Sequence, residues 1–258
     1  MGAKMTFSLE FLGTGDAGQV PVYNCDCFAC VRARCLKHYI RRPSSALLRI
    51  ADQLWLIDAG RTDLAELFPS VQLTGILQTH YHADHAQGLL HLRWGVNRSL
   101  PVWGPPDPEG FADLYKHPGI LDFSQPWQAF ESRHIEDVEI IAVPLQHSKM
   151  CFGYVFKSDE GSLAYLCDTV GLPSETSDFL ADIPLKYCIV DCSHPPRDTS
   201  PRNHNDVNTA LAIYEKLDVE EMIFTHISHE MDRWLESTQA VDLPSYVKIA
   251  KDGLKLVC

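Results

Sequence analysis

The sequence predicts an α/β fold in which two β-sheets pack face to face and helices cover their outer sides. Strand-like runs occur in two batches along the chain, and each batch has helical patterns between or after its strands. No Gly/Ser/Pro-rich linker divides the 258 residues, and no repeat period is present. The composition, with 45% hydrophobic and 22% charged residues, is that of a folded domain, which excludes disordered and fibrous classes.

The first batch of elements is predicted from short apolar or alternating runs that end in turn residues. The expected strands are Thr6–Leu12, Ala46–Ile50, Leu54–Ile57, Gly75–Gln78 and Pro101–Trp103. Apolar residues at helical spacing predict helices at Leu64–Phe68, His85–Arg93 and Gly110–Tyr115. Strands therefore form the framework of this half, and helices occupy its connections.

The second batch follows the same rules and is richer in strands. The expected strands are Val138–Val143, Phe152–Lys157, Ser162–Cys167, Tyr187–Val190, Glu221–Phe224, Val247–Ile249 and Leu254–Val257. Helices are expected at Ser174–Leu180 and His204–Leu217. Two strand-rich halves without a linker favour a single domain over residues 1–258.

Polar and potentially reactive side chains follow six of the predicted strands. They are Asp58, His80, His147, Asp168, Asp191 and His226. Functional sites collect at strand ends because rigid backbone passes there into loops. The recurrence of this pattern indicates a functional site built from several strand ends.

The strongest motif is HYHADH, which runs from His80 to His85. Histidine and aspartate supply the nitrogen and oxygen ligands that Zn, Mn and Fe prefer. In an extended chain, residues i and i+2 point the same way, so His80 and His82 can reach one metal ion. Asp84 and His85, at the start of the following helix, can turn towards a second ion. The alternative, a solvated polar turn, leaves four ligands in six residues unexplained.

Six residues cannot complete two coordination spheres, so further ligands are required. His147, Asp168 and His226 stand in the segments LQHSK, LCDT and FTHIS, each after an apolar strand. Taken singly, each is better explained as a capped turn or a satisfied core histidine. Their order after HYHADH favours metal coordination by all three, and the carboxylate of Asp168 can bridge two cations.

With Asp58-Ala59-Gly60 before it and these three residues after it, HYHADH resembles the signature of the metallo-β-lactamase superfamily. The resemblance covers nearly the whole chain and implies an αββα sandwich with a two-metal site at one sheet edge. It implies that His80, His82 and His147 hold one metal, that Asp84, His85 and His226 hold the other, and that Asp168 bridges them. Asp58 would orient a ligand from behind the metals. Aspartate at 84 and histidine at 226 match the hydrolases and nucleases of the superfamily and depart from the β-lactamases, so antibiotic hydrolysis is not expected.

Further segments resemble the PhnP-type phosphodiesterases of the bacterial carbon–phosphorus lyase pathway. They are LGTGDAGQVPVYNCDCFAC, RWGVNRSLPVWGPPD, DCSHPPR with RNHND, and THISHEMD. The resemblance implies hydrolysis of a small cyclic phosphodiester, 5-phosphoribosyl 1,2-cyclic phosphate, to ribose 1,5-bisphosphate in phosphonate catabolism. Asp16 departs from the family pattern, because the glycine-rich turn is usually small and neutral at that point.

Three of the nine cysteines, Cys25, Cys27 and Cys30, lie within six residues. Their thiolates suit a tetrahedral zinc ion, which needs a fourth ligand. The family uses a histidine like His229, so the resemblance implies a structural zinc held by these four residues. An N-terminal zinc-binding loop is therefore expected near residues 20–35. Three free thiols in a turn are the alternative.

The resemblance also implies a catalytic role for His204 in RNHND, as the acid that protonates the leaving oxygen. General acid help of this kind typically contributes about 10²–10⁴-fold. Asp84 and Asp168 would hold the cations for catalysis. The structural alternative places His204 in the first turn of the following helix, with Asn203 or Asn205 as its cap. The sequence assigns no role to His194, Arg197, Arg202 or the segment Arg41–Ser45.

Composition limits the partners and the compartment. Lys and Arg total 22 and Asp and Glu total 34, for a net charge of −12, which disfavours a broad nucleic-acid surface. No apolar run approaches the roughly 20 residues that span a bilayer, and the N-terminus does not look like a secretory signal. An odd number of cysteines suggests free thiols in a reducing, cytoplasmic compartment. The sequence leaves the oligomeric state open, with a homodimer as the working expectation.

Three other functions compete with the phosphodiesterase. A tRNA 3′-processing endonuclease shares HYHADH-type ligands, but it usually carries a basic Gly/Pro-rich arm that this sequence lacks. A thioester hydrolase of the glyoxalase type would not explain the cysteine cluster. A non-catalytic metal-binding module would have no need of a paired-metal site. Residue chemistry alone leaves the active-site metals open between Mn, Zn, Fe and Ni, and the resemblance favours Mn there and Zn at the cysteines.

Overall fold

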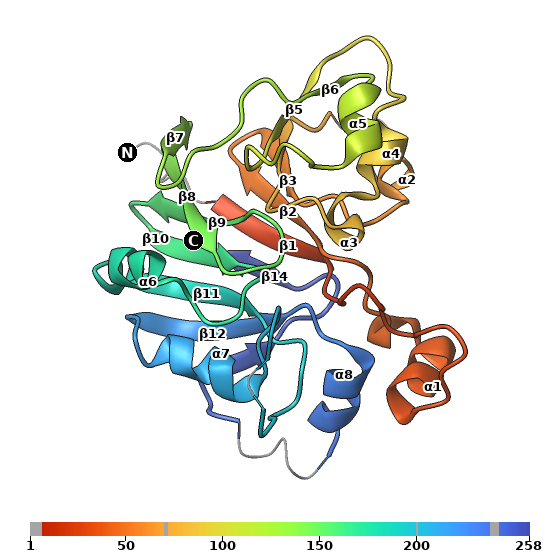
Figure 1. The fold of residues 1–258 in the computed structure, drawn as a ribbon, viewed down its shortest axis with the longest axis vertical. Coiled ribbons are helices and arrows are strands. Elements are labelled where there is room, and N and C mark those ends of the chain that lie inside the picture. Colours follow the sequence, from red (N-terminus) through yellow and green to blue (C-terminus); the bar gives the residue numbers. More distant parts are fainter. Residues whose placement is uncertain (1–6, 70–71, 200, 238–242) are drawn as a thin grey trace.

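The computed structural model describes residues 7–69, 72–199, 201–237 and 243–258. Two seven-stranded sheets face each other, and helices lie on their outer sides (Figure 1). This arrangement confirms the predicted α/β fold with an αββα layering. Among the described helices, none is long and apolar enough to cross a membrane.

The first sheet has the order β14-β1-β2-β3-β4-β5-β6. Its strands are β1 (Phe7–Gly13), β2 (Ser45–Ile50), β3 (Gln53–Ile57), β4 (Gly75–Leu77), β5 (Leu100–Trp103), β6 (Leu121–Asp122) and β14 (Lys255–Val257). The pairs from β14 to β3 are antiparallel, and those from β3 to β6 are parallel. The helices beside it are α2 (Leu64–Leu67), α3 (Ala83–Ala86), α4 (Leu89–Leu92) and α5 (Ala112–Lys116). The short α3 carries part of HYHADH.

The second sheet has the order β13-β12-β11-β10-β9-β8-β7. Its strands are β7 (Ser132–Ile135), β8 (Val138–Leu145), β9 (Cys151–Ser158), β10 (Gly161–Leu166), β11 (Leu185–Asp191), β12 (Val219–Thr225) and β13 (Val247–Ile249). The helices beside it are α6 (Ser174–Ala181), α7 (Val207–Tyr214) and α8 (His229–Leu235). Because β10, β11 and β12 run parallel, their carboxyl ends meet at one edge.

The central core lies between the sheets and is built by alternation along the strands. In β1, Phe7, Leu9 and Phe11 are buried in the cluster that joins both sheets, while the residues between them are half-buried. In β8, Ile140 faces this central cluster and Ile141 belongs to the cluster beneath α6 and α7. A strand that is buried on both faces has a continuous apolar sequence, whereas a strand with one exposed face has alternating apolar and polar residues.

All twelve predicted strands are present, apart from Thr6, which lies outside the described residues. The prediction missed β6, β7, α1 (Phe28–Cys35), the 3₁₀ turn Lys37–Tyr39, and α8. The predicted helix His85–Arg93 is wrong as one unit, because Gly88 packs against the Ala59–Arg61 backbone and separates α3 from α4. These short helices lack a long periodic pattern, which is the signal that sequence reasoning uses.

The predicted helix His204–Leu217 begins three residues later than expected. Helix α7 starts at Val207, and the side chain of Asp206 caps it by accepting a hydrogen bond from the Thr209 N–H. Asn203 and Asn205 are therefore not its caps. His204 lies in the loop that precedes the helix, so its side chain is not constrained by helical geometry.

A buried ion cluster attaches the N-terminal segment to α8, at the lower right of Figure 1. The Arg41 guanidinium donates from Nε to Asp232 Oδ1 at 2.9 Å, and Arg32 of α1 donates to Asp232 Oδ2 at 2.9 Å. Arg32 also pairs with Glu236. Arg41 additionally donates to the Ala250 carbonyl at 2.7 Å. The basic segment at Arg41 therefore anchors the fold.

We expect Asp232→Asn to lower the free energy of unfolding by about 3 kcal/mol, because two buried guanidinium groups would lose their common counter-charge. In a chain of this size the melting temperature should fall by roughly 6–12 °C, measured by differential scanning calorimetry. Glu221→Gln is the matched control, since its partner Lys248 is 52% exposed and such pairs contribute about 1 kcal/mol or less. Equal, small shifts in the two variants would contradict this account.

Candidate metal centres and active site

The first half of the site consists of three histidine rings that meet at the ends of β4 and β8. His80 and His82 come from the segment after β4, and His147 follows β8. His80 Nε2 lies 3.0 Å from His82 Nδ1, and His147 Nε2 lies 2.9 Å from the same atom. The nitrogens thus converge on one point, as ligands of a single cation would.

The second half contains Asp84 and His85 from α3, Asp168 after β10, and His226 after β12. His85 Nε2 and His226 Nε2 are 3.3 Å apart, and His226 Nε2 is 3.3 Å from Asp84 Oδ2. One donor atom from each of the four residues lies within 4.8 Å of every other. Two imidazoles and two carboxylates form a second possible cation site.

Asp168 connects the two halves through one oxygen atom. Its Oδ2 lies 3.2 Å from His85 Nε2 and 3.5 Å from His226 Nε2. The same oxygen lies 3.8 Å from His80 Nε2 and 3.9 Å from His147 Nε2. Tetrahedral ligands about 2.0–2.1 Å from a zinc ion stand about 3.3 Å from each other. The donor set and its spacing therefore fit two divalent cations that share Asp168.

Three of the clustered rings, those of His80, His85 and His226, have a second polar contact on the nitrogen that faces away from the cluster. Asp58 Oδ2 lies 2.7 Å from His85 Nδ1, and Thr79 Oγ1 lies 3.0 Å from His80 Nδ1. Ser193 Oγ lies 2.9 Å from His226 Nδ1. Such contacts fix ring orientation and tautomer in metal sites. Asp58 also accepts the Thr79 N–H at 2.8 Å, so one buried carboxylate organises both the strand end and a ligand.

The loop after β3 approaches the ligand loop closely. An added Cβ at Gly60 would stand 1.9 Å from the Asp84 carbonyl oxygen and 2.5 Å from that of Ser44. The Gly60 N–H donates to the Ser44 carbonyl at 3.0 Å. Only glycine allows this backbone contact, which places Asp84 and His85 beside the strand ends.

Burial and neighbouring charges shift the histidine pKa values in opposite directions in the two halves of the site. Burial lowers the pKa of His80, His82 and His147, which keeps these rings in the neutral form that binds metal. Burial also opposes charge on His85, but the Asp168, Asp58 and Asp84 carboxylates raise its pKa well above the usual range. The pKa of His226 rises to about 9, because Asp168 and Asp84 outweigh its burial. The carboxylates therefore attract positive charge to the second half.

His204 lies beside the second half and is 24% exposed. Its Nδ1 is 3.3 Å from Asp191 Oδ2 and 3.8 Å from Asp168 Oδ2, and its ring stacks on His226 with 4.9 Å between centroids. Burial opposes the charged ring, but Asp191 and Asp168 raise the pKa of His204. Asp191 is buried at the end of β11, where it also accepts the Thr169 N–H at 2.8 Å. The sequence marks Asp191 only as a strand-end residue.

The cysteine cluster forms a separate group against α8. Cys25 Sγ and Cys27 Sγ each lie 3.5 Å from His229 Nδ1, and Cys30 completes a set whose donor atoms lie within 4.8 Å of one another. His229 is the first residue of α8, which the buried Asp232 ties to α1. Three thiols and one imidazole fit a tetrahedral zinc ion. Of the other cysteines, Cys35 is exposed and the rest are buried.

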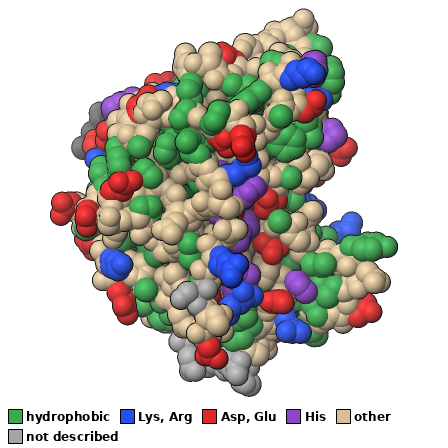
Figure 2. Space-filling view, in the orientation of Figure 1, with side chains coloured by type: hydrophobic (Ala, Val, Ile, Leu, Met, Phe, Trp, Pro, Cys, Tyr) green, Lys and Arg blue, Asp and Glu red, His purple; other side chains and the backbone are tan. Residues whose placement is uncertain are grey.

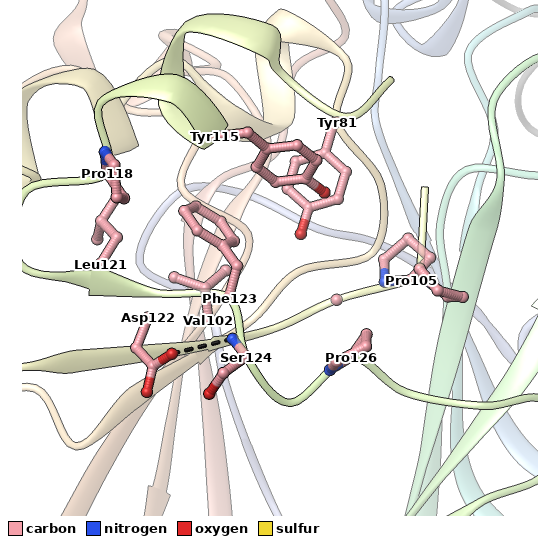
Figure 3. Close-up of a pocket in the computed structure, with 12 residues that line it drawn as sticks. Tyr81, Val102, Pro105, Tyr115, Pro118, Leu121, Asp122, Phe123, Ser124 and Pro126 are labelled. Atoms are coloured by element: carbon pink, nitrogen blue, oxygen red, sulfur yellow. Dashed lines mark hydrogen bonds between the residues drawn. The ribbon is translucent and has the colours of Figure 1, made fainter. Parts of the chain in front are cut away.

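Tyr81 points away from the histidines on either side of it. Its ring packs against Tyr115, with centroids 5.6 Å apart, and against Phe123 at 6.3 Å. These rings line a cavity of about 440 Å³ together with several prolines (Figure 3). The alternation expected of extended chain thus turns His80 and His82 toward the other donor side chains and places Tyr81, between them, in apolar surroundings.

Of the residues without a sequence assignment, His194 lies near the site, with its ring centroid 6.4 Å from that of His204. The Arg197 guanidinium lies 3.3 Å from Glu230, and both side chains are exposed. The His194 N–H donates to the Asn205 carbonyl at 3.3 Å, and Arg202 is exposed. In the space-filling view, histidines gather in a hollow with acidic side chains beside them and Lys or Arg side chains at its edges (Figure 2).

Comparison with known proteins gives several similarities. A solved structure described as a new diphosphatase from the PhnP family superposes with a TM-score of 0.82 and 26% identity, covering 99% of this chain and 98% of that one. Ribonuclease Z of Acaryochloris marina is 29% identical over 130 residues, which are 44% of this chain and 41% of that protein. Ribonuclease Z of Methanosarcina acetivorans is 25% identical over 160 residues, or 57% of this chain and 47% of that protein. The chain thus spans less than half the length of these curated relatives.

The sequence model of the beta-lactamase superfamily domain matches residues 55–227. The match includes Asp58, HYHADH, His147, Asp168 and His226, and so covers both halves of the site. The fold is shared with solved members whose overall sequences differ widely, such as the short form of human tRNase Z, which has a TM-score of 0.67 and 18% identity and covers 96% of this chain and 98% of that one. Because the match spans more than half of the chain, this protein belongs to the metallo-β-lactamase superfamily of hydrolases.

Proposed function

We propose that this protein is a two-metal phosphodiesterase that hydrolyses 5-phosphoribosyl 1,2-cyclic phosphate to ribose 1,5-bisphosphate in phosphonate catabolism. The observation that carries the proposal is Asp168 Oδ2, which lies within 3.9 Å of nitrogens from both ligand groups and of His204. The similarity to a diphosphatase of the PhnP family over 99% of the chain supports hydrolysis of a bond to phosphorus.

In this proposal, His80, His82 and His147 would hold one divalent cation, Asp84, His85 and His226 would hold the other, and Asp168 would be a ligand common to both groups. Bound Mn or Zn ions would supply charge stabilisation for the phosphoryl oxygens and a more acidic water. Asp58 keeps His85 oriented through the 2.7 Å contact between its Oδ2 and His85 Nδ1. The carboxylates of Asp84 and Asp168 would offset part of the charge of two bound cations.

His204 is the proposed proton donor to the leaving oxygen. Its Nδ1 faces Asp191 and Asp168, which leaves Nε2 as the ring atom available to the substrate. The neighbouring carboxylates favour the protonated ring, which is the form that a general acid requires. The Asp191 carboxylate accepts hydrogen bonds from the backbone N–H groups of Thr169 and Asn205. In this proposal, Asp191 is the positioning residue for His204.

We expect His204→Ala to lower kcat on the cyclic ribosyl substrate by about 10²–10⁴-fold, because a sugar oxygen leaves poorly without a proton. Hydrolysis of bis(p-nitrophenyl) phosphate should fall much less, since p-nitrophenolate leaves without one. Asp191→Asn should show the same leaving-group dependence in weaker form. Steady-state kinetics on both substrates, with metal content measured in parallel, tests this role. Equal losses on both substrates would show that His204 acts on the metals or the fold instead.

We also propose that Cys25, Cys27, Cys30 and His229 hold one structural zinc that fastens the N-terminal loop to α8. The double variant Cys25→Ser, Cys27→Ser should reduce the metal content from three to two equivalents per chain, measured by mass spectrometry. Its melting temperature should also fall, because metal binding to a folded site is folding free energy. Cys35→Ser is the control, since Cys35 is exposed and lies outside the cluster. Unchanged metal content in the double variant would contradict the zinc site.

A ribonuclease Z activity is the second candidate, because most of the similar curated proteins carry that name. The net charge of −12 disfavours it, since a nucleic-acid surface needs an excess of Lys and Arg. A non-catalytic metal-binding module is disfavoured by the buried polar contacts behind His80, His85 and His226. The free cysteines outside the cluster favour a reducing, cytoplasmic compartment.

These candidates give different results with three substrates. We expect cleavage of the cyclic ribosyl phosphate and of bis(p-nitrophenyl) phosphate in the presence of Mn, and no cleavage of precursor tRNA. Product release is measured by phosphate-ester chromatography and gel electrophoresis. Cleavage of tRNA alone would replace the proposed function with the ribonuclease, and absence of all three activities in metal-loaded protein would indicate the non-catalytic module. An Asp168→Asn variant controls for contaminating enzymes.

A further inference from the structure

The side chain of Gln78 is fully buried between the end of β4 and the motif HYHADH. Two hydrogen bonds fix its main chain. The Gln78 N–H donates to the Trp103 carbonyl at 2.9 Å, and the Tyr154 hydroxyl donates to the Gln78 carbonyl at 2.7 Å. The residue therefore belongs to the rigid edge of the first sheet, and its amide group lies beneath the ligand loop.

One atom of this side chain contacts both ends of the ligand motif. Gln78 Nε2 donates to the His80 carbonyl at 2.7 Å and to the His85 carbonyl at 2.9 Å. The same nitrogen lies 2.9 Å from Asp58 Oδ1, and the other oxygen of Asp58 lies 2.7 Å from His85 Nδ1. His80 belongs to the first ligand group and His85 to the second, so a single amide is connected to both groups.

These contacts act on the main chain of the ligands, whereas the other contacts act on their rings. Thr79 and Asp58 lie against the rings of His80 and His85 and set the ring orientation. Gln78 binds the two carbonyl groups and thereby sets the distance between the points from which the rings extend. The separation of the two ligand groups depends on that distance as well as on ring rotation.

The surroundings of the Gln78 amide fix its orientation. Three acceptors face the nitrogen, and an oxygen atom in its place would be repelled by all of them. The Oε1 atom at the other end is buried and has no hydrogen-bond partner among the described residues. A buried acceptor without a partner is unfavourable for folding, and such groups persist where a functional site requires them. The amide is therefore better explained by the ligand loop than by stability of the core.

We propose that Gln78 is a positioning residue that fixes the separation of the two ligand groups by holding the His80 and His85 carbonyls on one amide. This inference rests on the two-metal site of the proposed function, but not on its substrate. Without the amide, the two ends of HYHADH are no longer joined, and the donor atoms of both groups lose their preorganised spacing. Replacing residues that hold ligands from behind typically weakens metal binding by about 10–100-fold.

The test titrates Mn²⁺ into full-length protein freed of exchangeable metal, and measures the free ion by electron paramagnetic resonance. Gln78→Met has a similar size but no donor, and it should weaken the binding of both equivalents by about 10–100-fold. Gln78→Asn withdraws the amide by one methylene and should show a loss of the same kind. Thr176→Val is the matched control, since it removes a buried hydroxyl on α6 that donates to the Pro144 carbonyl at 2.6 Å. Its Mn²⁺ affinity should equal that of the unaltered protein.

The melting temperature separates this role from a purely structural one. Gln78→Met and Thr176→Val should both lower it, because each removes the donor to a main-chain carbonyl, but only the Gln78 variants should lose Mn²⁺ affinity. Unchanged affinity in both Gln78 variants, an equal loss in Thr176→Val, or a loss confined to one equivalent would overturn the proposal. If the unaltered protein binds two Mn²⁺ ions but cleaves no cyclic phosphodiester, the proposed substrate is wrong, and the ratio of affinities still decides the role of Gln78.

Discussion

The position of one carboxylate oxygen, Oδ2 of Asp168, is the constraint on which the site depends. Nitrogens of His80, His85, His147 and His226 surround it at 3.2–3.9 Å, and they come from both sheets. A buried carboxylate is costly unless positive charge compensates it. The burial of Asp168 beneath four imidazoles is therefore tolerated only as part of a site for protons or metal cations, and the two sheets must keep their relative position for it to exist.

Contacts behind the ligands show how the fold maintains that position. Asp58 at the end of β3 connects Thr79 with His85, and Ser193 after β11 holds His226. Each sheet thus orients the ligands that its own strand ends supply. The Arg41–Asp232 pair and the cysteine cluster fix a neighbouring part of the fold. They join the N-terminal segment to α8, the helix that follows His226.

Strands and metal-binding motifs could be predicted from the sequence because their signals are local. Alternation in β1 and the apolar run of β8 report burial directly, and HYHADH carries four donors in six residues. The missed elements have weaker local signals. Strand β6 has two residues, and α3 and α4 are separated by the packing of Gly88. Helix α7 starts at Val207, because the carboxylate of Asp206 caps it by accepting the Thr209 N–H.

The sequence by itself determined the fold class, the succession of strands along the chain and the types of donor side chain, since these follow from periodicity and residue chemistry. The family resemblance implied how the donors are grouped, and the tertiary structure gives their distances, because convergence depends on strand register and sheet packing between residues 65 to 142 positions apart. The tertiary structure also placed Asp191 behind His204, a role for which the sequence has no local signal. Distances between strand ends are a property of the packed sheets, and no stretch of sequence encodes them alone.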